Sequence, residues 1–535
     1  MKDKINIKYR KSIKKDISEI NNLFIELVNT VNERMIRNGI KPYTGMENGF
    51  ENGYLNNFYI NDSKVIYVAT DDEKVVGFIS IINYENDGYI YIDDYCVNDN
   101  YRGLGIGTKL MDLAFQYARS KKIDEVRTHV VTTNYESIQF YKNYGFNKIE
   151  EDGIRLLIKK DSNLSLEKQN EIIEKNNLIV EKVLNEIKNT CPDSIDMVAI
   201  AGSFCSKQFY EKSDCDLFIV ANNENVGNIS KCFILNDIGQ DIYVSYWKNL
   251  RDMSNYTDHF VTKLKDLNII YTRTPDVLDL YKLLQVRLNK NMNNDKLINK
   301  NIGKYLGIAI EEYKNMNQIN DLNEFYIKLG LIMNNFEKII YMINKKYVVG
   351  GTKSIPFEIM NMDILPDNFL DNYNSLFETN DKEKIIDYLN KIVDSLVIYF
   401  KKNNIDIINP EKIQEKPSKK QEISRDVLIG TYEELFSNYY NKLHYATRIK
   451  NKYLSLRTMI DAQDFFDYFS NNYLINKFNL AGKYNPDNLE QNAIEFDNCL
   501  SKWKELYNSY GIKIEKYDSI DELYSDKKEN NVIKQ

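Results

Sequence analysis

Residues 89–108 read YIYIDDYCVNDNYRGLGIGT, a strand-like run followed by three glycines at alternate positions. The opening run is rich in β-branched and aromatic residues, which is typical of a strand, and apolar residues recur at helical spacing from Thr108 onward. The glycines let the backbone turn tightly and point several N–H groups at an anion, and the N-terminus of a following helix adds partial positive charge. We therefore expect a strand–turn–helix unit that holds a pyrophosphate without a metal.

The glycine pattern is GxGxG, which differs from the GxGxxG of dinucleotide-binding folds, and no GK[ST] completes a Walker loop. Around it, the spacing of apolar residues predicts alternating helices and strands throughout residues 1–160. The expected helices are 14–38, 108–121 and 135–144, and the expected strands are 65–70, 75–83, 89–97, 125–131 and 154–159. The pattern indicates an α/β domain that ends at a polar linker over residues 160–170.

Two blocks of this domain carry a family resemblance. Residues 89–108 and the block 134–146, NYESIQFYKNYGF, closely resemble the acetyl-CoA-binding core of the GNAT N-acetyltransferases. The resemblance covers residues 1–160 and implies acetyl-CoA as the cofactor. It implies that the cofactor contacts Asn134 and the following residues: Val97, Arg102, Gly103, Leu104, Gly105, Ile106, Gly107 and Thr108. It also implies that Tyr141 protonates the leaving thiolate, a role that a phenol can fill.

An acceptor amine must lose a proton before it can attack a thioester, so a base is needed beside the loop. Asp93 and Asp94 lie on the strand that precedes the glycines, and strand alternation predicts that they point to opposite faces. The segment 92–95 is similar to the corresponding strand of diamine acetyltransferases, in which an acidic residue serves as base. We assign the base to Asp93, and a solvated strand-end carboxylate is the alternative for either residue.

A second constellation lies further along the chain. Gly202 and Ser203 follow the apolar run 197–201, and residues 213–220 read SDCDLFIV. In a strand, residues two apart share a face, so the carboxylates of Asp214 and Asp216 should converge on one point. Paired hard oxygen ligands suit Mg²⁺. A third carboxylate, Asp241, opens the next strand-like run and either completes a two-metal site or acts as base on a hydroxyl.

This set resembles the polymerase-β-type nucleotidyltransferase superfamily over residues 196–247. The segments 268–275 and 344–353 loosely resemble the kanamycin and lincosamide branch. The resemblance implies nucleotidyl transfer from ATP or another NTP with Mg²⁺. It places Gly202 and Ser203 at the phosphates, Asp214, Asp216 and Asp241 at the metal, and Asp241 also near the attacking oxygen.

A chain of 535 residues is too long for one core. We expect a multidomain protein of the α/β plus α class, with two linkers. The predicted domains are a GNAT α/β domain at 1–160, a small mixed-sheet nucleotidyltransferase domain at 171–275, its helical domain at 276–408, and a helical C-terminal domain of unassigned role at 425–535. The second linker, 409–422, is charged and contains two prolines.

Composition narrows the class of partner. A net charge of −7 with both signs interspersed argues against a general nucleic-acid binder and fits a cationic partner. No apolar run approaches the ~20 residues of a membrane span, and no signal peptide is evident. The six cysteines lack CxxC spacing, which indicates reduced thiols in a cytoplasm. We expect a cytoplasmic protein, with a homodimer as one alternative for its assembly.

Together the two constellations predict a bifunctional enzyme that acetylates an amine and nucleotidylates a hydroxyl. A small molecule that carries both groups, such as an aminoglycoside-type antibiotic, is the most economical shared acceptor, by analogy at the level of the fold. Four alternatives remain at this point. They are a polyamine acetyltransferase, a protein-lysine acetyltransferase, a toxin–antitoxin-type enzyme that modifies a protein or tRNA, and a sensor that binds its nucleotide without catalysis.

Overall fold

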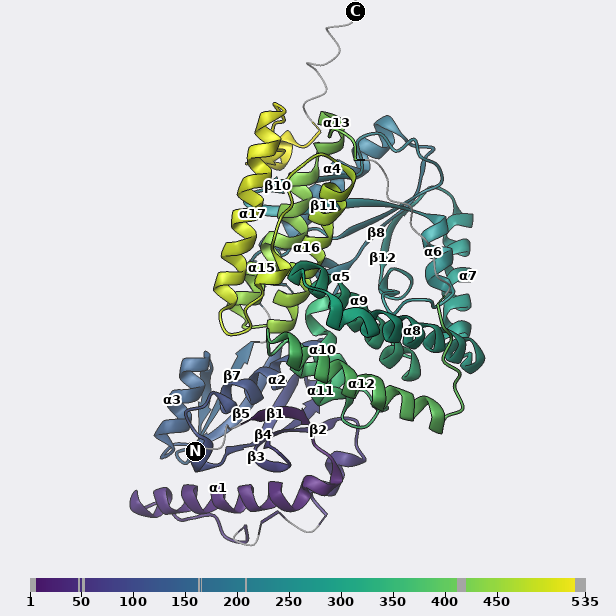
Figure 1. The fold of residues 1–535 in the computed structure, drawn as a ribbon. Helices are drawn as coiled ribbons and strands as arrows, with labels where there is room; N and C mark the ends of the chain where they lie inside the picture. Colours follow the sequence, from purple (N-terminus) through teal and green to yellow (C-terminus); the bar gives the residue numbers. More distant parts are fainter. Residues whose placement is uncertain are drawn as a thin grey trace, which may run out of the picture. The chain divides into compact units, whose positions relative to one another are not determined.

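The computed structural model describes residues 6–46, 49–50, 53–161, 164, 166–206, 209–410 and 420–524. The chain divides into two compact units, Met1–Leu166 and Glu167–Gln535, which are described separately. Figure 1 shows that each unit is built around a β-sheet with helices packed against it. None of the described helices has an apolar stretch of the length needed to cross a bilayer.

The N-terminal unit contains a seven-stranded sheet of order β1-β2-β3-β4-β5-β7-β6. Its strands are β1 (Ile7–Lys11), β2 (Lys64–Asp71), β3 (Lys74–Tyr84), β4 (Tyr89–Val97), β5 (Glu125–Val131), β6 (Asn147–Glu151) and β7 (Arg155–Asp161). The main helices are α1 (Ile17–Arg37), α2 (Ile106–Ser120) and α3 (Tyr135–Tyr144), with short 3₁₀ turns η1 (Lys14–Asp16), η2 (Leu55–Tyr59), η3 (Glu85–Asp87) and η4 (Asp99–Tyr101). Neighbouring strands run antiparallel except β4 and β5, which are parallel.

Helices cover both faces of this sheet (Figure 1). Phe78 of β3 packs into a buried cluster with Leu23 and Phe24 of α1. The preceding residue, Gly77, faces Leu110 of α2. Because consecutive strand residues point to opposite faces, α1 and α2 lie on opposite sides of the sheet. Removing the large apolar surfaces of these helices from water stabilises the sandwich.

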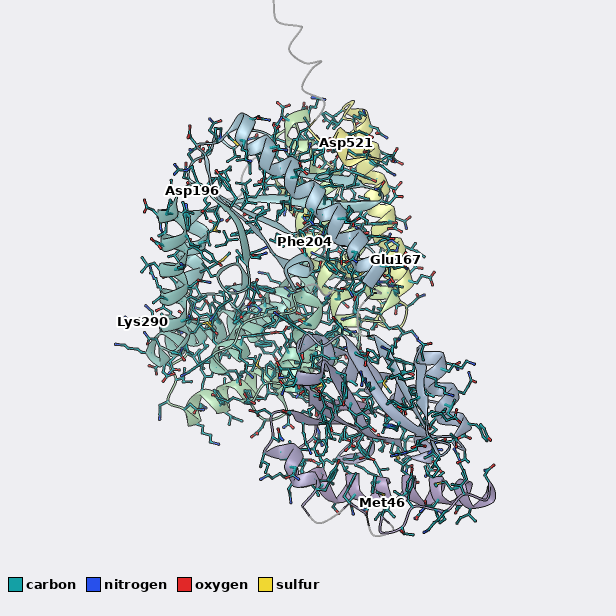
Figure 2. The ribbon with its side chains drawn as sticks, turned by 180° about the vertical axis from the view of Figure 1, so that it is seen from behind. Met46, Glu167, Asp196, Phe204, Lys290 and Asp521 are labelled. Atoms are coloured by element: carbon teal, nitrogen blue, oxygen red, sulfur yellow. The ribbon has the colours of Figure 1, made fainter. Side chains whose placement is uncertain are left out.

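The C-terminal unit contains a six-stranded mixed sheet of order β12-β8-β9-β11-β10-β13. Its strands are β8 (Ile195–Ile200), β9 (Leu217–Ala221), β10 (Lys231–Leu235), β11 (Ile238–Tyr246), β12 (Asn268–Thr272) and β13 (Lys516–Tyr517). The β9–β11 and β10–β13 pairs are parallel, and the others are antiparallel. Figure 2 labels Asp196 in β8 and Phe204 in α5, just beyond the end of that strand.

Helices make up the rest of this unit. In its first part they are α4 (Leu166–Thr190), α5 (Gly202–Ser206), α6 (Trp247–Ser254), α7 (Pro275–Met292), α8 (Asp295–Asn315), α9 (Leu322–Ile343), α10 (Ile355–Met360), α11 (Phe369–Ser375) and α12 (Lys382–Lys402). The later ones are α13 (Arg425–Leu428), α14 (Thr431–Leu435), the π-helix η8 (Phe436–Tyr440), α15 (Asn441–Arg448), α16 (Lys452–Asn472) and α17 (Leu489–Ser509). Short 3₁₀ turns are η5 (Thr262–Leu264), η6 (Met316–Gln318), η7 (Thr352–Ser354), η9 (Ala481–Lys483) and η10 (Ile520–Glu522).

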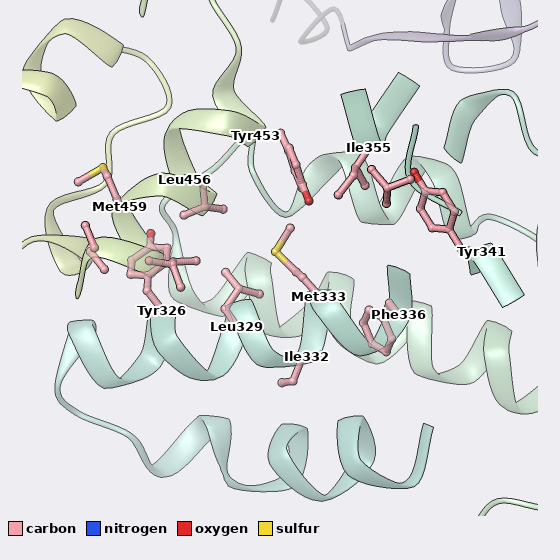
Figure 3. Packing of buried hydrophobic residues seen from close by; sticks show 14 of the residues in the cluster. Tyr326, Leu329, Ile332, Met333, Phe336, Tyr341, Ile355, Tyr453, Leu456 and Met459 are labelled. Carbon is pink, nitrogen blue, oxygen red and sulfur yellow. The ribbon is translucent and has the colours of Figure 1, made fainter. Parts of the chain in front are cut away.

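One hydrophobic core runs through the C-terminal unit, from Met197 in the sheet to Trp503 in α17. Figure 3 shows its centre, where Leu329 and Met333 of α9 face Leu456 of α16. The core therefore joins residues 171–275, 276–408 and 425–535, which the sequence predicts as three domains. The boundaries between these domains stay predictions.

The sequence predicts the strongly periodic elements well and misses others. The expectation that residues 425–535 are helical is wrong at β13, which pairs with β10. Strand β6 was not expected because its sequence, NKIEE, is exposed throughout and has no apolar alternation. Strand β13 has two residues, too few for any periodic pattern.

Candidate active sites

The turn between β4 and α2 presents free backbone N–H groups. Gly103 and Gly105 have φ of +80° and +78°, and a Cβ at either position would meet nothing within 4 Å. Glycine is therefore required by the backbone conformation and not by crowding. Gly105 is the N-cap of α2 and offers no side chain to cap it. The N–H groups of the first helical turn, which have no partner within the helix, are left to bind an anion.

The loop is fixed at its two ends. Before the glycines, the Arg102 side chain donates from Nε to the carbonyl of Val97 at 3.2 Å and pairs with Asp99 at 2.6 Å. At the other end of the loop, a Cβ on Gly107, the last of the three glycines, would overlap the hydroxyl of Tyr95. Only glycine at this position allows the Tyr95 ring to pack against the start of α2. Strand β4 and helix α2 are thereby held in close contact.

Tyr141 lies on α3 and is 5% exposed. Its ring lies 6.3 Å from that of Tyr95 and 5.2 Å from that of Phe146. Burial raises the pKa of Tyr141 above its usual value, with the hydroxyl of Thr128 as a polar neighbour. The phenol is therefore protonated at neutral pH and can donate a proton.

A β-bulge places the two aspartates of β4. The register between β3 and β4 shifts so that Asp93 and Asp94 lie together opposite Ser80. The parallel ladder between β4 and β5 ends at Ile92, so the carboxylates follow the point where the two strands stop pairing. A bulge interrupts strict two-residue alternation, and alternation alone therefore does not assign faces to these two side chains.

The two carboxylates have different partners. The hydroxyl of Tyr54 donates a hydrogen bond to Asp93 Oδ2. Asp94 donates its backbone N–H to Ser80 Oγ at 2.9 Å. Burial, followed by the charge of Asp93, raises the pKa of the Asp94 carboxyl to about 8. A protonated Asp94 beside Asp93 limits the negative charge that this pair carries at neutral pH.

Asn134 is the N-cap of α3, and its side-chain oxygen accepts from the N–H of Ser137 at 3.3 Å. The same oxygen accepts from Arg34 of α1 at 2.6 Å, and that guanidinium also pairs with Glu136 at 2.7 Å. Asn134 is thus held from two sides, with its amide nitrogen as the remaining donor. Sequence reasoning missed Tyr54 and Arg34, because each reaches its partner only through tertiary packing.

In the C-terminal unit, Gly202 and Ser203 contact Asp216 directly. Gly202 has a φ of +52°, and a Cβ there would overlap Asp216 Oδ2. The N–H of Ser203 donates to the same oxygen at 3.3 Å. The structure therefore brings together the two halves of the second constellation.

Asp214 and Asp216 lie in the segment that leads into β9, which begins at Leu217, and not within the strand. In the parallel ladder Ile242 pairs with Leu217, so Asp241 lies beside Asp216. Burial, followed by the charge of Asp216, raises the pKa of Asp214 to about 7. Burial also raises the pKa of Asp241, which accepts from Cys232 Sγ at 3.4 Å.

Polar groups around these carboxylates are incompletely paired. Gln240 is fully buried and accepts the N–H of Cys215 at 2.9 Å. Its Nε2, Ser203 Oγ and Asn176 Oδ1 are buried atoms with no hydrogen-bond partner among the described residues. In the part of the chain that the structure describes, no group of three or more His, Cys, Asp or Glu side chains is arranged to hold a metal ion. The metal-binding role of Asp214, Asp216 and Asp241 stays a prediction.

Comparisons with known proteins match the first unit. Residues 34–146 match the acetyltransferase (GNAT) family. An uncharacterized N-acetyltransferase of Archaeoglobus fulgidus is 30% identical over 124 residues, which are 22% of this chain and 82% of that protein. An uncharacterized N-acetyltransferase of Methanocaldococcus jannaschii is 29% identical over 163 residues, 26% of this chain and 72% of that one. The PaiA N-acetyltransferase of Thermoplasma acidophilum, solved in complex with coenzyme A, is 21% identical over 29% of this chain and 99% of its own, with a TM-score of 0.26.

Proposed function

Since the chain belongs to the acetyltransferase (GNAT) family through residues 34–146, we propose that its N-terminal unit transfers an acetyl group from acetyl-CoA to an amine of a small molecule. The observation that carries this proposal is the uncapped N-terminus of α2 behind Gly103 and Gly105. It offers N–H groups to a pyrophosphate at the end of the strand that carries Asp93.

The loop fits the cofactor. Acetyl-CoA supplies the acetyl group as an activated thioester. The N–H groups from Gly103 to Thr108 would hold its pyrophosphate, whereas the N–H of Arg102 already donates to the carbonyl of Asp99 at 3.3 Å. Val97 lies where the loop begins. The open space beside Gly103 and Gly105 lets phosphate oxygens approach the backbone. Asn134, with its oxygen already bonded to Ser137 and Arg34, turns its amide donor to the cofactor.

Asp93 acts as the base. An amine is cationic in water at neutral pH, and a carboxylate both attracts it and accepts its proton before the attack. Tyr54 holds the carboxylate in position until the amine takes over the hydrogen bond. Asp94, whose pKa is raised to about 8, stays largely protonated at neutral pH and does not compete for the proton of the amine.

Tyr141 acts as the acid. Its raised pKa keeps the proton on Oη at neutral pH, so Tyr141 would be a proton donor for the departing sulfur of the cofactor. Tyr95 holds α3 and α2 around this position through its packing against Gly107 and the Tyr141 ring.

An aminoglycoside-type amine is the acceptor that we propose, with polyamines as the competing class. The test is incubation of the full chain with acetyl-CoA and each amine, with the product mass as readout. Acetylated aminoglycoside supports the proposal. Acetylated spermidine with unmodified aminoglycoside would transfer the assignment to polyamines.

A second function, nucleotidyl transfer, is favoured by the contact of Gly202 and Ser203 with Asp216. Asp241 lies beside Asp216, and the unpaired Ser203 Oγ is a free hydrogen-bonding group next to them. We propose that Ser203 binds phosphate oxygens of ATP or another NTP. Asp214, Asp216 and Asp241 would bind Mg²⁺, an assignment that a direct metal titration tests because the described carboxylates form no ready three-residue group.

The proposed acceptor of the nucleotidyl group is a hydroxyl of the same small molecule. Incubation with Mg²⁺, each NTP and the aminoglycoside, followed by product mass, tests it. Nucleotide attached to the drug supports the proposal. Nucleotide attached to a protein or a tRNA in place of the drug would favour the toxin-like alternative.

A further inference from the structure

A helical segment from the last part of the chain packs directly on the strand that carries Asp241. A Cβ on Gly239 of β11 would overlap the backbone of Ser437 in the π-helix η8. Only a glycine at this position allows so close an approach. The π-helix and the helix α15 that continues it therefore lie against the carboxylate site. Irregular turns of this kind often occur at functional sites.

One face of this segment points at the carboxylates. Asn438 lies near the Asp241 carboxylate, and the ring of Tyr445 lies 4.8 Å from that of Tyr210. Lys442 lies between Asn438 and Tyr445 at helical spacing, so it shares their face. Its charged neighbours come from three elements, namely Asp214 before β9, Asp241 in β11 and Asp461 in α16.

Lys442 nevertheless makes no ion pair within 4.0 Å in the described part of the chain, and it is exposed. A lysine whose role was to neutralise these carboxylates would contact one of them. An ammonium held at a distance from several acids leaves space between the opposite charges. Phosphate oxygens fit such a space, because they take charge-assisted hydrogen bonds from lysine while a cation bridges them to carboxylates.

A second lysine is fixed nearby. Lys353 Nζ lies over the rings of Tyr210 and Tyr445, at 5.9 and 5.5 Å from their centroids. Tyr210 and Ser213 exchange two hydrogen bonds of 2.9 Å, which anchor this cluster to the loop that leads into Asp214. Arg448 lies over the same rings, but its charge is already paired with Glu211 at 2.7 Å. Lys175, which lies near Asp214, is half-buried and donates to the carbonyl of Ser213 at 3.0 Å. In the described part of this site, Lys353 and Lys442 are exposed lysines without an ion pair and are available to a ligand.

We propose that Lys442, supported by Lys353, forms a polyphosphate-binding wall opposite the Asp214, Asp216 and Asp241 carboxylates. The segment formed by η8 and α15 then completes this site for the triphosphate of a nucleotide. The inference rests on the proposed nucleotidyl transfer and deepens it. It also gives a role to residues 436–448, to which the sequence assigns none.

The test is calorimetric titration of the full chain with ATP, and separately with inorganic tripolyphosphate, in Mg²⁺. Loss of one charge-assisted hydrogen bond lowers affinity by about tenfold to a hundredfold, so Lys442→Gln should weaken both ligands by that factor. Lys353→Gln should have a smaller effect in the same direction. Lys504→Gln, which changes an exposed lysine of α17, serves as the matched control and should bind as the unmodified chain does.

The outcomes separate this inference from the function on which it rests. Equal ATP affinity in Lys442→Gln and the unmodified chain would overturn the lysine wall and leave nucleotide binding intact. Tripolyphosphate binding that depends on Lys442, with no preference for ATP and no nucleotidyl product, would support the wall and overturn nucleotidyl transfer. Binding of neither ligand would overturn both. Recovery of affinity in Lys442→Arg shows that the charge is what matters, and its failure to recover would count against a simple charge role.

Discussion

The two candidate sites each begin at a glycine that follows a strand and precedes a helix, yet the two glycines serve opposite purposes. Gly105 has open space beside it, and Gly202 is pressed against Asp216. The first turn leaves its backbone free for a ligand. The second turn already has a carboxylate against its backbone, so a ligand there must bind through that carboxylate and its neighbours. The first site is therefore suited to bind an anion through backbone N–H groups, and the second site is suited to bind a ligand through side chains.

The sharpest way to break this comparison is Asp93→Asn. If Asp93 is the base of the first site alone, acetyl transfer should fall about 10²- to 10⁴-fold in kcat/KM, the usual contribution of a positioned base. The second activity should not change, because Asp93 lies in the other compact unit. Steady-state rates of both reactions are the measurement. The control is Asp87→Asn, an exposed carboxylate of the same unit, and a comparable loss in that variant would remove the special role of Asp93.

Tyr141→Phe should lower kcat for acetyl transfer about a hundredfold while the affinity for acetyl-CoA changes little, because the hydroxyl acts when the thiolate leaves. Kinetics combined with direct titration of acetyl-CoA separate the two quantities. An equal loss of rate and of affinity would assign Tyr141 to cofactor binding.

Substitution of the glycines compares the two turns directly. Gly202→Ala should lower the free energy of unfolding of the C-terminal unit by about 3 kcal/mol, from overpacking against Asp216 and an unfavourable φ. Tryptophan fluorescence, recorded during urea unfolding, reports the unfolding of the C-terminal unit alone, since both tryptophans, Trp247 and Trp503, belong to it. Gly105→Ala should leave that transition unchanged and cost the N-terminal unit only about 1 kcal/mol. Equal effects of the two variants on the fluorescence transition would contradict the comparison.

The comparison also predicts a pH dependence of the N-terminal unit. The folded pKa of Asp94 is raised to about 8, above its unfolded value, so the protonated carboxyl stabilises the fold at low pH. This stability should decline as pH rises from about 4 to about 8, by up to about 1.4 kcal/mol per pH unit. Circular dichroism, recorded during urea unfolding, measures the free energy of unfolding of the N-terminal unit. The transition of this unit is the one that tryptophan fluorescence does not report. Asp94→Asn should flatten the dependence, and an unchanged slope would show that another group causes it.

The sequence predicts the first site more completely than the second. Strand Tyr89–Val97 and helix Tyr135–Tyr144 have the predicted bounds, because their periodicity is strong and the glycine turn lies between well-marked elements. The bulge that brings Asp93 and Asp94 together opposite Ser80 has no sequence signal, since it depends on the register with a neighbouring strand.

Long-range partners were beyond reach of the sequence. Tyr54 and Arg34 come from segments that the pattern treats as ordinary surface, and folding brings them to Asp93 and Asn134. In the second site, Gly202, Ser203 and Asp216 were predicted together and do contact one another. Lys442 was not predicted, because nothing in its local sequence shows which strand its helix covers.

The most direct test of the account is acetyl transfer itself. The full chain and its Asp93→Asn and Asp216→Asn variants would be incubated with acetyl-CoA, Mg²⁺, ATP and an aminoglycoside, and the product masses measured. We expect an acetylated drug from the unmodified chain and from Asp216→Asn, and acetylation slowed about a hundredfold or more in Asp93→Asn. Absence of acetylated product with every amine tested, or undiminished acetylation by Asp93→Asn, would contradict the account.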